Sequence, residues 1–146
     1  MGMANPSVPV LPCMCANLRR TARAMNQLYE EALRPAGIRA TQFTILQAFS
    51  LAGEITQRQL GQILAMDSTT LTRTLTIMSR HGWIAKQRGE DRREWRMRLS
   101  KAGEIQLRKA LPYWEAAQTE LRRELGDELS ESLKTLTQKI TNALIK

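Results

Sequence analysis

The sequence predicts a mainly helical fold with one small β-hairpin in the second half of the chain. Strong helix formers such as Leu, Ala, Met, Arg, Glu and Gln are common, whereas aromatic residues make up only 5%. Apolar residues recur every three or four positions along most of the chain, and strict alternation appears in one segment only. With 146 residues, 42% of them hydrophobic, the chain is long enough for one packed core with additional self-association helices.

Residues 1–12 contain three prolines and little charge, which predicts a flexible, extended N-terminal arm. A helix is expected from about Cys13 until Pro35 and Gly37 end it. Its apolar residues follow a 4-3-4-3 spacing and form one stripe: Leu18, Ala22, Met25, Tyr29 and Ala32.

Two helices are expected next. Thr41 is the predicted cap of a helix that runs to about Ala52, with Gly53 ending it. The residues expected to face inward are Phe43, Leu46 and either Phe49 or Ser50. Thr56 is the predicted cap of a short third helix that carries Leu60, Ile63 and Leu64.

A fourth helix is expected from Asp67 or Ser68 to His81, closed by Gly82. Its two faces differ in chemistry: apolar residues (Leu71, Leu75, Met78) lie opposite a stripe of hydroxyl and guanidinium groups (Thr69, Thr72, Arg73, Thr76, Arg80). Such a face suits the major groove of DNA, where Thr contacts base edges or thymine methyls and Arg pairs with guanine. Solvated helix faces more often carry Glu and Lys.

After this helix, the spacing of apolar residues changes to every second position. Residues 83–88 and 94–99 predict two strands joined by a polar turn at 89–92, with Trp95, Met97 and Leu99 on the buried face. From Arg80 to Arg98 there are seven basic residues and three acids, and the acids cluster near the tip. We expect Asp91 to pair with one of Arg92 and Arg93 and fix its direction, so that this Arg enters a minor groove.

Ser100 is expected to start another helix, with apolar residues Leu107, Leu111, Trp114, Leu121 and Leu125 and a candidate kink at Pro112. A last helix carries Leu129, Ser130, Leu133, Leu136, Ile140 and Ala143. Helix, helix, helix and hairpin in this order predict a winged helix-turn-helix core at 37–103. The remaining helices, at 13–36 and 104–146, have narrow apolar stripes that suit self-association.

An excess of 22 Lys and Arg over 14 Asp and Glu leaves a net charge of +8, which indicates a polyanionic partner. No apolar run approaches the roughly 20 residues of a membrane span, and no secretory signal is visible, so we expect a soluble cytoplasmic protein without membrane association.

Neither a catalytic Ser/His/Asp set nor a glycine-rich phosphate loop is visible, which disfavours an enzyme and predicts no cofactor. A helical protein-interaction module without specific DNA binding is the alternative that stays open.

The segment from Ile55 to Gly103 resembles the DNA-binding core of the MarR family. The matching features are "LG" at Leu60-Gly61, "TLTRTL" at 70–75, "HGWI" at 81–84, "DRR" at 91–93 and "LSKAG" at 99–103. The helix order extends the resemblance to almost the whole chain from about Cys13.

This resemblance implies a homodimer held by the first and the last two helices, bound to a pseudo-palindromic operator in double-stranded DNA. It places the helix from Ser68, including Thr70, in the major groove and Arg93 in the minor groove. It further implies a transcriptional regulator, more often a repressor than an activator, that a small aromatic ligand or an oxidant releases from DNA.

The cysteines Cys13 and Cys15 bear on whether an oxidant is the signal that releases the protein from DNA. They lie too close in sequence for a stabilising disulfide loop, and with one histidine they cannot complete a structural zinc site, so no metal is expected. Cys15 and Tyr29 are similar to the reactive cysteine and a tyrosine of the family's organic-hydroperoxide-sensing branch, but Arg19 stands where that branch has a second tyrosine. Arg19 and the helix N-terminus both favour a thiolate. Unreactive thiols are the alternative, as is a metal shared across a dimer.

Overall fold

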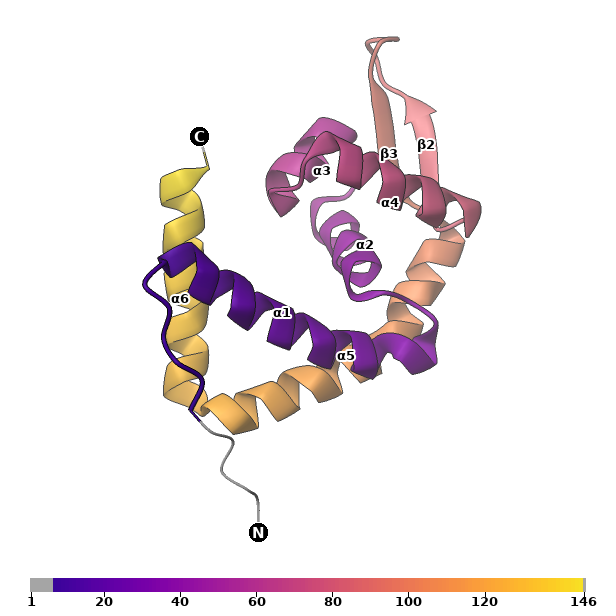
Figure 1. Ribbon diagram of the computed structural model, residues 1–146. Coiled ribbons are helices and arrows are strands. Elements are labelled where there is room, and N and C mark those ends of the chain that lie inside the picture. The colour runs from indigo at the N-terminus through magenta and orange to yellow at the C-terminus, as the bar shows by residue number, and fades with distance from the viewer. Residues whose placement is uncertain (1–6, 146) are drawn as a thin grey trace.

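The computed structural model describes residues 7–145 (Figure 1), so half of the predicted arm, residues 1–6, lies outside the described residues. The prediction of a mainly helical fold with a small amount of β-structure is confirmed. In chain order the elements are α1 (Met14–Leu33), the 3-10 turn η1 (Arg34–Ala36), α2 (Ala40–Ala52), β1 (Ile55–Thr56), α3 (Gln57–Leu64), α4 (Ser68–Arg80), β2 (Ile84–Arg88), β3 (Trp95–Leu99), α5 (Lys101–Leu125) and α6 (Asp127–Leu144).

The helices α2, α3 and α4 pack with the sheet into one lobe, from which α1, α5 and α6 extend (Figure 1). The centre of this lobe is α2, whose Phe43, Ile45, Leu46 and Phe49 are almost completely buried. Of the two alternatives for an inward residue, Phe49 is correct, because Ser50 is exposed. The lobe therefore has a continuous apolar core that fixes how α3, α4 and the hairpin sit on one another.

The sheet has three strands in the order β1-β3-β2, all antiparallel, and not only the two of the predicted hairpin. Ile55 pairs with Met97 and Thr56 with Arg96. The sequence did not indicate β1, because a strand of two residues shows no periodicity and its partner is distant in the chain. Thr56 ends this strand and also caps α3, where its hydroxyl accepts from the Gln59 backbone N–H at 3.1 Å.

The start of α2 is also different from the prediction. The helix begins at Ala40, and Thr41 is not its cap. Two side chains bind the free backbone N–H groups at this end instead. The Gln42 side-chain oxygen accepts from the Arg39 backbone N–H, and the carboxylate of Glu30 in α1 accepts from the Ala40 backbone N–H, both at 3.0 Å. Because Glu30 reaches α2 only through the packing of α1, local sequence could not reveal this cap.

The C-terminal part of the chain consists of the two helices α5 and α6. One helix runs from Lys101 to Leu125 and contains Pro112, and it bends part-way along its length in Figure 1. Proline removes one helical hydrogen bond, which explains such a bend. The last helix begins at Asp127, directly after Gly126 at a φ of 79°. None of the helices within residues 7–145 is both long and apolar enough to span a membrane.

Candidate nucleic-acid interface

Helix α4 presents the two faces that its sequence predicts. Leu71, Leu75 and Met78 are at most 2% exposed and anchor the helix to the core. The opposite side is solvent-exposed and contains no carboxylate; we call it the reading face, and it consists of Thr69, Thr72, Arg73, Thr76 and Arg80. Ser68 and Thr70, in the first turn, are exposed as well.

Asp67 holds the N-terminus of α4. Its carboxylate accepts from the Thr70 backbone N–H at 2.9 Å, which identifies Asp67 rather than Ser68 as the cap. Hydrogen bonds from Thr70 lower the pKa of Asp67 below its usual value. The carboxylate is therefore charged at neutral pH, and it stabilises the helix through the positive end of the helix dipole.

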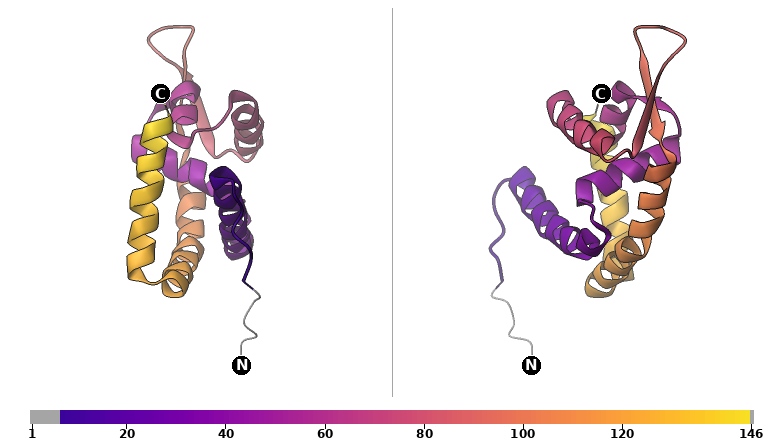
Figure 2. Two further views of the ribbon diagram at one scale, coloured as in Figure 1. Left: turned by 60° about the vertical axis from the view of Figure 1, so that its left-hand side comes forward. Right: turned by 90° about the vertical axis from the view of Figure 1, so that its right-hand side faces the viewer.

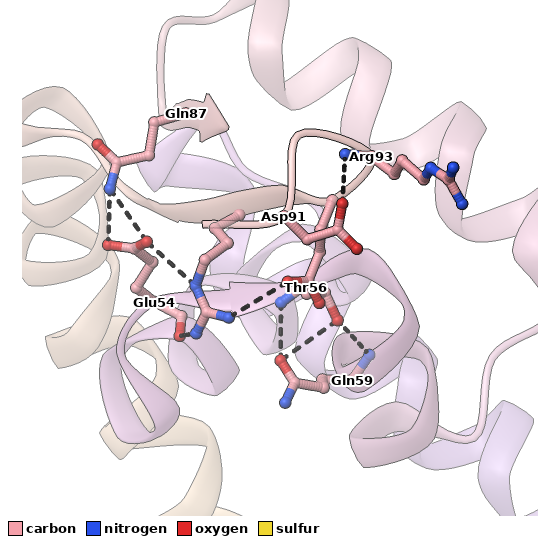
Figure 3. Close-up of polar contacts among 8 residues, drawn as sticks. Glu54, Thr56, Gln59, Gln87, Asp91 and Arg93 are labelled. Carbon is pink, nitrogen blue, oxygen red and sulfur yellow. Dashed lines mark hydrogen bonds and ion pairs between the residues drawn. The ribbon is translucent and has the colours of Figure 1, made fainter. Parts of the chain in front are cut away.

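The wing, which we define as β2, β3 and the turn 89–94, projects away from the helices in every view (Figure 2). Its turn is closed by two backbone bonds of 2.9 Å, Gly89 N–H to the Glu94 carbonyl and Glu94 N–H to the Asp91 carbonyl. The Asp91 carboxylate accepts from the backbone N–H of Arg93 at 3.0 Å (Figure 3). The predicted pair between Asp91 and a guanidinium is thus replaced by a bond to the backbone, and the Arg93 side chain points away from Asp91. Within residues 7–145, neither Arg92 nor Arg93 is in an ion pair.

Arg88 supports the other side of the wing tip. Its guanidinium lies 4.7 Å from the ring centroid of Trp95, the cross-strand partner of Arg88, and it donates to the Arg92 carbonyl. The expectation of a buried Trp95 is wrong, because this side chain is 50% exposed. At the end of a hairpin that projects into solvent, alternation no longer means burial, and the indole packs against Arg88 instead.

Glu54 ties the wing to the lobe. Its carboxylate accepts from Arg96 at 3.2 Å and from Gln87 at 3.0 and 3.1 Å, and Arg96 also donates to the Glu54 carbonyl (Figure 3). The Arg96 guanidinium is thus engaged in fixing the direction of β3. The guanidinium groups of Arg92 and Arg93 remain at the tip, directed to solvent.

Comparison with known proteins agrees with this geometry. Residues 38–95 match the MarR family. YwoH, an uncharacterized HTH-type transcriptional regulator of Bacillus subtilis, is 30% identical over 87 residues, which cover 60% of this chain and 64% of the length of that relative. The M. tuberculosis transcriptional regulator MosR, solved in complex with DNA, is 35% identical with a TM-score of 0.77, covering 90% of this chain and 98% of that chain. The chain belongs to the MarR family.

MarR-family proteins are transcriptional regulators and not enzymes, so the expectation of a protein without catalysis is confirmed. A cysteine-to-serine variant of E. coli MarR, solved with operator DNA, has a TM-score of 0.79 at 24% identity over 87% of this chain and 92% of that chain. This likeness shows that the fold is the same.

Three polar residues of this MarR-family chain were missed from sequence: Gln57, Glu54 and Arg88. Gln57, the first residue of α3, donates to the Thr72 hydroxyl oxygen at 2.8 Å across the helix-turn-helix. Arg88 was predictable in principle, because the hairpin register places it opposite Trp95. No local pattern identifies Gln57 or Glu54, whose partners lie 15 and 42 positions away.

Both thiols lie exposed at the start of α1. Cys13 is the N-cap and accepts from the Ala16 backbone N–H at 3.4 Å, and Cys15 accepts from the Arg19 guanidinium at 3.3 Å. Tyr29 does not share this site within one chain, because fourteen helical residues correspond to roughly 21 Å. Its hydroxyl donates to Gln118 of α5, and burial raises the pKa of Tyr29.

Proposed function

We propose that this protein is a sequence-specific regulator of transcription that binds double-stranded DNA as a homodimer. The observation that carries the proposal is the reading face of α4, exposed and free of carboxylates, beside a wing whose tip holds Arg92 and Arg93. The fold shared with MosR, whose structure was solved in complex with DNA, supports it further.

In this proposal α4 lies in the major groove. The residues that contact DNA from it are Ser68, Thr69, Thr70, Thr72, Arg73, Thr76 and Arg80. The backbone N–H groups and the hydroxyls in the first turn of α4 bind phosphate. Arg73 is suited to guanine. Arg92 and Arg93 enter the adjacent minor groove, whose negative potential attracts guanidinium groups. Glu54 and Asp91 hold the wing in the direction that this requires.

In this proposal, different segments of the chain bind DNA and form the dimer. Residues 37–103 bind DNA, and residues 13–36 and 104–146 associate with a second copy. An open apolar groove of about 570 Å³ lies between α1, α5 and α6, and Leu18, Met25, Leu121, Leu133 and Ile140 are among the residues that line it. Exposed Leu129 and Leu136 extend this apolar surface along α6. A second copy would bury it, as large exposed apolar surfaces usually require.

We further propose that the dimer represses transcription and that a signal releases it from DNA. Two sites support two different signals. The first is the pair of thiols: Cys15, beside Arg19, attacks an organic hydroperoxide as the thiolate, becomes a sulfenic acid and releases an alcohol. Cys13 then condenses with the sulfenic acid to form a disulfide and release water. In the alternative, an external thiol reduces the sulfenic acid.

The second site is a hollow of about 260 Å³ between the dimerisation helices and the DNA-binding lobe. Phe43 and Trp114 form its aromatic wall, with ring centroids 5.8 Å apart, and Asn26, Thr41 and Thr44 add polar groups. This volume and lining suit a single aromatic ring with a polar substituent, such as a phenolic acid. A ligand here would change how α1 and α5 meet α2, and with it the distance between the two reading faces of a dimer.

Selection of bound duplexes from a random library tests the DNA-binding proposal. We expect a pseudo-palindrome with half-site centres about 10 bp apart, and affinity that falls steeply with salt. Binding to single half-sites would contradict the dimer. Equal, weakly salt-dependent binding to every duplex would favour an interaction module instead.

A further inference from the structure

The threonines of α4 do not all present the same hydrogen-bonding group to DNA. The Thr76 hydroxyl donates to the Thr72 carbonyl at 2.8 Å, and the Thr74 hydroxyl donates to the Thr70 carbonyl at 3.0 Å. A threonine has one hydroxyl proton, so this back-bonding uses the only donor of Thr76. Thr76 therefore offers the reading face a methyl group and an oxygen that only accepts.

Thr72 is in the opposite situation. Among residues 7–145, its hydroxyl makes no bond to a carbonyl of α4, and its oxygen instead accepts from the Gln57 side-chain amide at 2.8 Å. Gln57 lies at the first position of α3, so this bond joins the two helices of the helix-turn-helix. With its oxygen occupied by a donor, the Thr72 hydroxyl has its proton left to give.

We propose that Gln57 determines which base Thr72 recognises: by donating to the Thr72 oxygen, it directs the hydroxyl proton outward to a hydrogen-bond acceptor on a base edge. This inference rests on the proposed function, sequence-specific binding of duplex DNA. Gln57 is a positioning residue in this role, since it acts on the base through Thr72.

The consequence is a two-part preference in each half-site. Thr72 selects a major-groove acceptor, such as O6 of guanine or O4 of thymine, and rejects cytosine, which offers only an amino donor there. Thr76 selects the amino group of cytosine or adenine. The two residues are one helical turn apart, roughly 6 Å along the axis, so they address base pairs about two steps apart.

The test is selection from randomised duplexes with the full chain, followed by competition binding at each position of the selected site. The variants are Gln57→Leu, Thr72→Val and the double variant. We expect each single change to reduce discrimination at the same base pair about 2- to 10-fold, the range of one hydrogen bond. The double variant should lose no more than either single variant, because both changes remove one and the same contact.

Thr74→Val is the matched control, since it makes the same chemical change on α4 at a residue outside the reading face. It should leave base preference unchanged. Gln57→Glu gives an independent check: a carboxylate only accepts, so the Thr72 proton turns inward and the preference moves toward cytosine. Circular dichroism and the salt dependence on generic duplex DNA establish that each variant is folded.

Three results would overturn the inference: a change at a different base pair in Gln57→Leu and Thr72→Val, a uniform loss across all sequences, or an unchanged preference in Gln57→Glu. A uniform loss identifies Thr72 as a phosphate contact. Failure of the proposed function is distinguishable, because the wild-type chain would then select no site at all.

Discussion

The carboxylate of Asp91 accepts a 3.0 Å hydrogen bond from the backbone N–H of Arg93, two residues along the wing turn. This bond fixes the backbone from which the Arg93 guanidinium extends, without neutralising its charge. A bond to the guanidinium itself would have competed with DNA. The orientation of Arg93 therefore depends on an acceptor at position 91, and not on a negative charge there.

The wing variants test this directly. We expect Arg93→Ala to weaken operator binding by about 1–3 kcal/mol, the cost of losing an Arg that contacts the groove. Asp91→Ala should show part of that loss, whereas Asp91→Asn, whose amide oxygen still accepts from the Arg93 N–H, should stay near wild type. Fluorescence anisotropy at low and moderate salt provides the measurement. Wild-type affinity in both alanine variants would remove the wing from the interface.

Gly103 is required by a close contact at the start of α5. The Ser100 N–H donates to the Trp83 carbonyl at 3.0 Å, and a Cβ at Gly103 would overlap that carbonyl oxygen. We expect Gly103→Ala to lower the free energy of unfolding by about 1–3 kcal/mol, as overpacking does. Gly89→Ala is the control, because its Cβ would meet only the side chains of Glu94 and Arg96. Equal thermal midpoints for the two variants would contradict this explanation.

The cap of α4 gives a pH dependence with a definite sign. Hydrogen bonds from Thr70 lower the pKa of Asp67, so the stabilisation is present at neutral pH and is lost as the pH falls through the pKa of the folded state. Asp67→Asn keeps a capping oxygen but has no charge. We expect the wild type to be the more stable at pH 7, with the difference shrinking below about pH 4. Urea unfolding over this range measures it, and a difference that does not change with pH would exclude a role for the charge.

The dimer is tested on α6. Leu136 is 58% exposed on the apolar stripe of α6, and Leu51, 90% exposed at the end of α2, lies on the DNA-binding lobe. We expect Leu136→Glu to shift the mass in light scattering from twice the chain mass of 16.6 kDa toward one chain, with helicity retained. Leu51→Glu should leave the dimer intact. A wild-type chain that is monomeric and still binds DNA tightly would end the dimer proposal.

The two proposed signals predict different responses of the cysteine variants. If oxidation is the signal, organic hydroperoxide should release wild-type protein from DNA, a reductant should restore binding, and Cys15→Ser should bind normally but ignore the oxidant. Cys13→Ser should still respond but recover differently. If a phenolic acid in the hollow beside Phe43 is the signal, it should release wild type and both variants alike. Equal oxidant sensitivity of wild type and Cys15→Ser would exclude the redox signal.

The sequence by itself determined the features that follow from local patterns. The two faces of α4, the caps at Thr56 and Ser100, and the ends of α2 and α4 at glycines with positive φ were all predictable. Each depends on side chains within about one helical turn, where spacing fixes geometry. The excess of basic residues around the hairpin was equally plain.

Tertiary structure alone decided the contacts between residues far apart in the chain. Glu30 caps α2 from α1, Gln57 binds Thr72 across two helices, and Glu54 holds Arg96 at the base of the wing. In each case a polar side chain takes a partner that local spacing does not specify, because only the packing of the buried core brings the two together. Such contacts set the direction of the wing and occupy the acceptor oxygen of the Thr72 hydroxyl. No periodicity in the sequence could therefore have revealed either feature.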